Sequence, residues 1–151
     1  NLTCFLRHSC ILSLIVLCIN ACSDRSDSSL SNEVTDIDNP LTECPSSPNC
    51  YRTTLEYKVP AERLFNISRE VLTSMDVSQL EADENEQFIS AVFTIWVFRF
   101  KDDFTLKVES QNGKTYLHLR SASRKGYSDL GVNRHRINEF VKKVETKLEM
   151  N

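Results

Sequence analysis

The feature that most constrains this chain is a hairpin signature over residues 103–121, DFTLKVES, QNGK and TYLHLRS. Apolar and polar residues alternate on both sides of Asn112-Gly113, as in strands that bury one face. Asn and Gly accept the positive φ angles of a tight two-residue turn, so the segment predicts two antiparallel strands. Their core face would carry Phe104, Leu106, Val108, Leu117 and Leu119, and the opposite face Tyr116, His118 and Arg120.

The segments around the hairpin predict the other elements. Residues 51–59 and 76–83 favour strands, and residues 137–148 predict an amphipathic C-terminal helix. A further helix follows Pro60, with Leu64, Ile67, Val71 and Met75 at helical spacing. This order predicts an α+β fold, an antiparallel sheet of about five strands with two helices packed on one face. It is similar to the order of reduced helix-grip lipid-binding domains.

Residues 88–100, FISAVFTIWVFRF, predict one long strand that ends in a turn at Lys101-Asp102-Asp103. A half-solvated strand alternates more cleanly, so part of this strand should be covered on both faces. One interpretation is a helix on one side and a loop or terminal segment on the other. The alternative is an apolar ligand, partner or membrane surface beside Trp96 and Phe98.

The N-terminal residues have the features of a bacterial export signal. A short basic region precedes the apolar run CILSLIVLCI, which is too short to span a bilayer. The run leads into INAC, which resembles a lipobox and predicts a lipid on Cys22; the alternatives are a plain cleaved signal peptide and an uncleaved anchor. Ser23, where aspartate would favour the inner membrane, favours the outer membrane facing the periplasm. We expect a signal peptide at residues 1–21, a disordered acidic tether at 22–43 and one folded domain at 44–151.

Two cysteines enclose the motif CPSSPNC, from Cys44 to Cys50. In an oxidising compartment a disulfide is the expected pairing. Two thiols with no paired histidine nearby make a poor metal site, and the spacing differs from the C-x-x-C of redox pairs.

Charge is unevenly distributed along the chain. Residues 22–50 hold six acidic residues and one basic residue, whereas residues 99–136 hold nine Lys and Arg against four Asp and Glu. The net charge of −3 gives no general argument for nucleic-acid binding. The basic half is either a solvated surface or an attraction for an anionic partner.

The run RSASRKGYSDLGVNRHRI at residues 120–137 connects the last strand to the last helix. Gly126 and Gly131 allow turns, and Ser128 or Asp129 can cap the helix. Its arginines fit either a partly buried Arg–Asp network or an anion site at the helix start. The anion site would use Arg120 and Arg124, helped by Ser121 and Ser123. The candidate residues for the two interpretations together are Arg120, Ser121, Ser123, Arg124, Asp129, Asn133, Arg136, Asp102 and Asp103.

Three motifs in order, CPSSPNC, FRFKDD and RSASRKGYSDLGVNRHRI, resemble the domain of unknown function 1499 family over residues 41–148. Members are often secreted or lipid-anchored bacterial proteins. The resemblance implies no agreed activity, substrate or catalytic residue. Its motif positions correspond to Cys44, Pro45, Ser47, Pro48, Asn49, Cys50, Asp102, Asp103, Arg120, Ser121, Ser123, Arg124, Gly126, Asp129, Asn133 and Arg136.

We expect no catalytic residue, metal or cofactor, because nucleophile-elbow, P-loop and zinc-protease motifs are missing from the sequence. The expected function is a non-catalytic envelope domain that binds an anionic or amphipathic small molecule or an envelope partner. One alternative is an envelope hydrolase that holds an anionic substrate in loop 120–136, which requires a pocket where His118 or His135 meets an acid and a nucleophilic serine. The other is a structural assembly factor with a flat apolar patch near Trp96.

Overall fold

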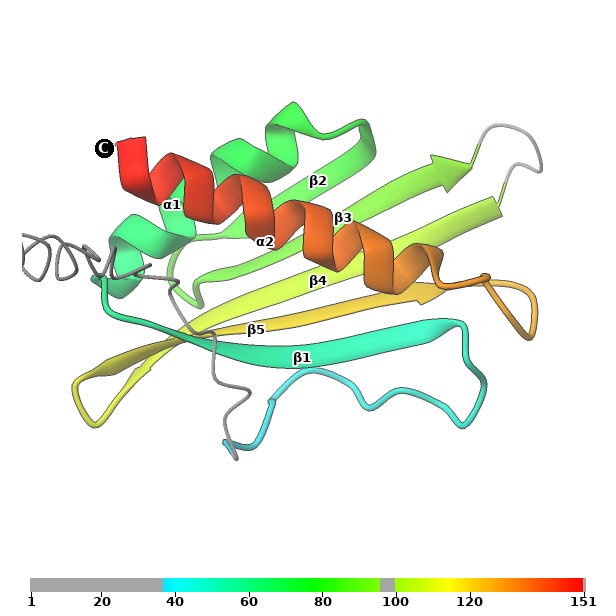
Figure 1. The fold of residues 1–151 in the computed structure, drawn as a ribbon, viewed down its shortest axis with the longest axis horizontal. Helices are drawn as coiled ribbons and strands as arrows, with labels where there is room; N and C mark the ends of the chain where they lie inside the picture. The colour runs from blue at the N-terminus through cyan, green and yellow to red at the C-terminus, as the bar shows by residue number, and fades with distance from the viewer. Residues whose placement is uncertain (1–36, 96–99, 151) are drawn as a thin grey trace, which may run out of the picture. The chain divides into compact units, whose positions relative to one another are not determined.

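The computed structural model describes residues 37–95 and 100–150, which form a five-stranded antiparallel sheet and two helices (Figure 1). In chain order the elements are β1 (Cys50–Tyr57), α1 (Ala61–Ser74), β2 (Val77–Asp83), β3 (Phe88–Ile95), β4 (Phe100–Gln111), β5 (Lys114–Ser123) and α2 (Val132–Met150). The strands lie in the order β1-β5-β4-β3-β2. The predicted α+β fold is confirmed. The predicted signal peptide, Cys22, most of the tether, Trp96 and Phe98 lie outside the described residues.

β4 and β5 form the predicted hairpin. Gln111 pairs with Lys114, and the two residues between them, Asn112 and Gly113, have φ angles of 53° and 76°. Positive φ at both positions matches the right-handed twist of the strands that they join. The five residues expected on the core face are all buried.

The predicted turn at residues 101–103 is wrong, and so is the single strand over 88–100. β3 ends at Ile95 and β4 begins at Phe100, so the chain reverses direction inside the apolar run. Asp102 and Asp103 are paired across the sheet with Phe93 and Val92. These carboxylates resemble a turn signal in the sequence, but they belong to a strand because arginines more than twenty residues away neutralise them.

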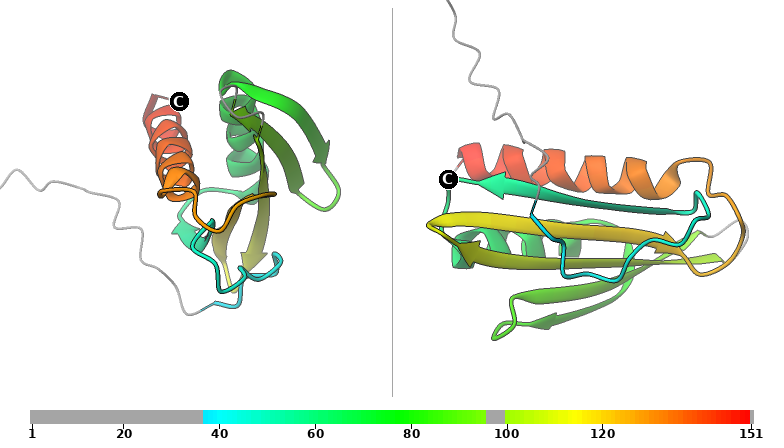
Figure 2. Two further views of the ribbon diagram at one scale, coloured as in Figure 1. Left: turned by 90° about the vertical axis from the view of Figure 1, so that its right-hand side faces the viewer. Right: turned by 90° about the horizontal axis from the view of Figure 1, so that it is seen from below.

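The core lies between the sheet and the two helices. α2 runs across the sheet and α1 lies beside it (Figures 1 and 2). α1 buries Leu64 completely and leaves Val71 only 3% exposed, at the helical spacing predicted. Phe140 of α2 lies edge-to-face on Phe104 of β4, with ring centroids 5.2 Å apart. We call the face of the sheet that packs against the two helices the helix side.

The other side, which we call the outer face, is only partly exposed. His118 of β5 is fully buried there, and Tyr116 is 5% exposed. The described N-terminal segment, residues 37–49, runs alongside β1 (Figures 1 and 2). Asn39 donates to the Thr53 carbonyl, its own carbonyl accepts from Arg52, and Leu41 is buried. A terminal segment therefore helps to close this edge of the sheet.

Candidate functional site

The candidate residues at positions 120–124 fall on two sides of the sheet. β5 continues to Ser123, so successive side chains alternate in direction. Ser121 and Ser123 face the helix side, where both contact Asn133 of α2. Arg120 and Arg124 face outward and line a groove. The structure therefore does not bring these four residues together into one anion site.

The helix side holds a buried ion pair between Arg136 of α2 and Asp102 of β4. Arg136 Nη2 donates to Asp102 Oδ2 at 2.7 Å, and Asp102 is completely buried. Arg136 Nη1 donates to Ser121 Oγ at 3.1 Å and to Asn133 Oδ1 at 2.8 Å. The guanidinium also lies over the ring of Phe93, 4.6 Å from its centroid. We call Asp102, Ser121, Ser123, Asn133 and Arg136 the helix-side cluster.

Asn49 joins the cysteine motif to this cluster. Its side-chain nitrogen donates to the Gly126 carbonyl at 2.5 Å, and its own carbonyl accepts from Asn133 Nδ2 at 2.9 Å and from the Ser123 N–H. The predicted disulfide between Cys44 and Cys50 is confirmed and closes the loop that contains Asn49. The three sequence motifs thus meet around the start of α2.

Asp129 accepts hydrogen bonds from backbone N–H groups just before and at the start of α2. Its carboxylate accepts from the N–H of Gly131 at 3.0 Å and of Asn133 at 2.7 Å. Burial alone would raise the pKa of Asp129, but these hydrogen bonds outweigh it and hold the pKa below its ordinary value. These N–H groups are the donors that an external anion would need, and the chain's own carboxylate takes them.

The outer face carries a groove of about 380 Å³, which we call the outer groove. Side chains from β2 to β5 and the residue after β5 line it, among them Gln79, Glu81, Ser90, Asp103, Thr105, Arg120 and Arg124. Arg124 is neutralised, because its Nε and Nη2 donate to Asp103 at 2.7–3.0 Å. This pair forms one wall of the groove.

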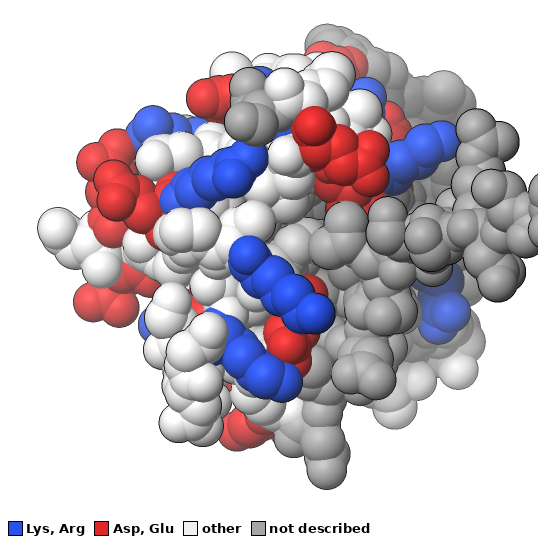
Figure 3. Space-filling view, turned by 60° about the vertical axis from the view of Figure 1, so that its left-hand side comes forward, with Lys and Arg blue, Asp and Glu red and all other residues white. Residues whose placement is uncertain are grey.

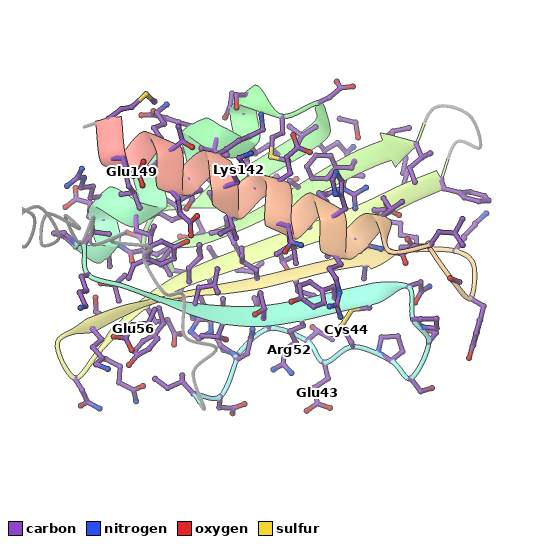
Figure 4. The ribbon with its side chains drawn as sticks, viewed as in Figure 1. Glu43, Cys44, Arg52, Glu56, Lys142 and Glu149 are labelled. Carbon is purple, nitrogen blue, oxygen red and sulfur yellow. A yellow bond between two sulfur atoms is a disulfide. The ribbon has the colours of Figure 1, made fainter. Side chains whose placement is uncertain are left out.

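Arg120 differs from the other described arginines of the signature motifs, because its side chain makes no hydrogen bond, ion pair or ring contact with a described residue. Even Arg134, which lacks a described acid, lies over the ring of Tyr51. The Arg120 side chain is half-buried and its Nε is fully buried. Arg52 of β1 lies directly opposite in the sheet, and Arg52 extends towards the N-terminal segment that carries Glu43 (Figure 4). Like charges in opposite positions destabilise a sheet, and no described acid pairs with Arg120 to offset its repulsion with Arg52.

His118 lies near a hydroxyl and an acid, but the hydroxyl belongs to Thr54 rather than to the serine that the hydrolase alternative requires. Thr54 Oγ1 lies 2.9 Å from His118 Nδ1, and Glu109 Oε2 lies 3.6 Å from Nε2, beyond hydrogen-bond distance. Thr54 is 5% exposed and His118 is fully buried, so a substrate cannot reach the hydroxyl. His135 is exposed and forms no ion pair with a described acid.

Acidification should weaken the fold through His118. Burial lowers the pKa of His118 below its ordinary value of 6.5, against the opposing effect of Glu109. The unfolded chain therefore binds more protons, and unfolding free energy should fall by up to about 1.4 kcal/mol per pH unit below 6.5, down to the folded pKa. The other charged groups that act on the ring are Lys107, Arg52 and Asp38. When urea unfolding is measured at several pH values, the unfolding free energy of His118→Gln should change less per pH unit than that of the wild type. An equal pH dependence would contradict this role of His118.

The described residues form no metal site, and the face drawn in Figure 3 carries no single basic patch. Within residues 37–95 and 100–150, no group of three His, Cys, Asp or Glu side chains could hold a metal ion. Figure 3 shows Lys and Arg interspersed with Asp and Glu on one face. In the same ranges, no helix is long and apolar enough to cross a membrane.

Fold and contacts together define a disulfide-closed α+β domain whose motif residues converge at the start of its last helix. Residues 40–144 match the sequence model described as Protein of unknown function (DUF1499), and the chain belongs to this family. The resemblance found in the sequence motifs is thereby confirmed.

Two solved structures are similar to this chain at low identity. One is the crystal structure of Ara h 8.0201, with 13% identity and a TM-score of 0.49 over 68% of this chain and 98% of that one. The other is the crystal structure of TTHA0849 from Thermus thermophilus, with 13% identity and a TM-score of 0.41 over 67% and 94%. No curated protein matches the sequence.

Proposed function

We propose that this protein is a non-catalytic, lipid-anchored domain of the bacterial envelope that binds an anionic group in the outer groove. The lipid would be on Cys22, and the domain would face the periplasm from the outer membrane. Arg120 would be the main contact for the anion. The observation that carries the proposal is that this half-buried arginine has no partner among the described residues.

The energetics of a buried arginine support this role. A buried N–H donor without an acceptor loses its hydration and gains nothing in return, which costs about 1–3 kcal/mol. Protein structures normally pair such groups, as Arg136 is paired with Asp102 here. Carboxylates and phosphates match the planar guanidinium, so a bound anion would satisfy Arg120 and reduce its repulsion with Arg52.

The test is a titration of the full chain in detergent with inorganic phosphate, for the wild type and for Arg120→Gln. A charged hydrogen bond contributes about 1.5–3 kcal/mol, so the substitution should weaken phosphate binding by about tenfold or more. Arg69→Gln is the matched control, because Arg69 lies on α1 and pairs with Glu84. It should bind as the wild type does, and both variants should unfold near the wild-type temperature. The proposal fails if the wild type does not bind phosphate, or if Arg120→Gln binds it equally well.

A further inference from the structure

Four side chains form one row across the outer groove. Register pairs Arg120 with Thr105, Thr105 with Ser90, and Ser90 with Glu81, so each residue is the direct neighbour of the next. All four line the groove. Neighbouring strands lie about 4.8 Å apart, so the row is about 14 Å long. A molecule with one or two sugar rings fits this length.

The row has a definite chemical polarity. Arg120 at one end only donates hydrogen bonds, and the Glu81 carboxylate at the other end only accepts them. Between them, the hydroxyls of Ser90 and Thr105 can do both. The side chains of Glu81, Ser90 and Thr105 make no hydrogen bond or ion pair with the other described residues. Three groups are therefore available to hydroxyls of a ligand whose anionic group lies at Arg120.

An acyl chain would fit this row poorly. Among the outward-facing residues of the groove, Val92 is the apolar one, and it is only 9% exposed. A hydrocarbon laid along the row would remove water from two hydroxyls and a carboxylate without replacing their hydrogen bonds. That desolvation opposes binding.

We infer that the ligand of the outer groove is a hydroxylated anion, of the sugar phosphate or sugar acid class, rather than an amphipathic lipid. The inference rests on the anion-binding role proposed for Arg120. Its anionic group would lie against Arg120, its hydroxyls against Thr105 and Ser90, and a far hydroxyl against Glu81. The groups available in the row thus restrict the chemistry of the ligand.

The test compares four probes on the full chain: inorganic phosphate, glucose 1-phosphate, glucuronate and hexyl phosphate. Hexyl phosphate is the matched control, because it has the six carbons of glucose 1-phosphate without hydroxyls. The NMR signal of the Arg120 Nε–H reports occupancy at the site itself. Glucose 1-phosphate or glucuronate should bind about tenfold or more tightly than phosphate, and hexyl phosphate should not. Whichever of the two sugars binds more tightly shows whether the site prefers a phosphate or a carboxylate.

The double variant Ser90→Ala with Thr105→Val should lose most of the preference for the sugars over phosphate, because only Glu81 of the row would remain for their hydroxyls. The inference is overturned if hexyl phosphate binds more tightly than both sugars, if both sugars bind no better than phosphate, or if most of the preference survives in the double variant. Each of those results leaves phosphate binding at Arg120 intact. Failure of phosphate itself to bind would instead overturn the proposed function.

Discussion

Replacing Asp102 with Ala should lower the free energy of unfolding by about 3–5 kcal/mol, because it leaves the charge of Arg136 buried without a counter-charge. Asp102 is fully buried, Arg136 is 8% exposed, and they are 2.7 Å apart. Chemical unfolding followed by circular dichroism measures the effect.

The double variant Asp102→Leu with Arg136→Met separates the ion pair from the space that it fills. Replacing both charges with apolar groups of similar volume is often neutral, so this variant should regain most of the stability that Asp102→Ala loses. Phosphate binding should remain in the double variant, since Arg120 lies on the other side of the sheet. A loss below about 1.5 kcal/mol for Asp102→Ala would show that water reaches Arg136.

Phe140→Ala should cost about 3–5 kcal/mol, the usual range for removing a fully buried aromatic ring. Phe140 has no exposed surface and packs on Phe104 of β4, so the substitution leaves a cavity between α2 and the sheet. Val132→Ala on the same helix is the control. Val132 is 38% exposed, and this change should alter stability by less than about 0.5 kcal/mol. Equal losses for the two variants would contradict the position of Phe140 in the core.

Local patterns in the sequence predict most of the fold. The hairpin follows from alternation and the Asn112-Gly113 pair, and both helices follow from apolar residues at helical spacing. The start of β4 could not be predicted in the same way. Its charged residues Asp102 and Asp103 are acceptable in a strand only because Arg136 and Arg124 reach them from distant parts of the chain.

The candidate site was only partly predictable. Arg120, Ser121, Ser123 and Arg124 are close in sequence, but strand alternation separates them because β5 extends to Ser123. The order Arg-Ser-Ala-Ser-Arg has a period of two and could have indicated this. Glu81, Ser90 and Thr105 were missed, since only strand pairing brings them beside Arg120.

Missense changes at Arg120, Ser121 and Ser123 would affect the protein in the cell in two different ways. At Ser121 or Ser123 a change would loosen the attachment of α2 and lower the amount of protein, because quality control removes unfolded chains. At Arg120 it would leave abundance unchanged and, under the function proposed above, remove only anion binding. Neighbouring positions of one strand would therefore be under different selection, for stability at Ser121 and Ser123 and for the proposed anion binding at Arg120.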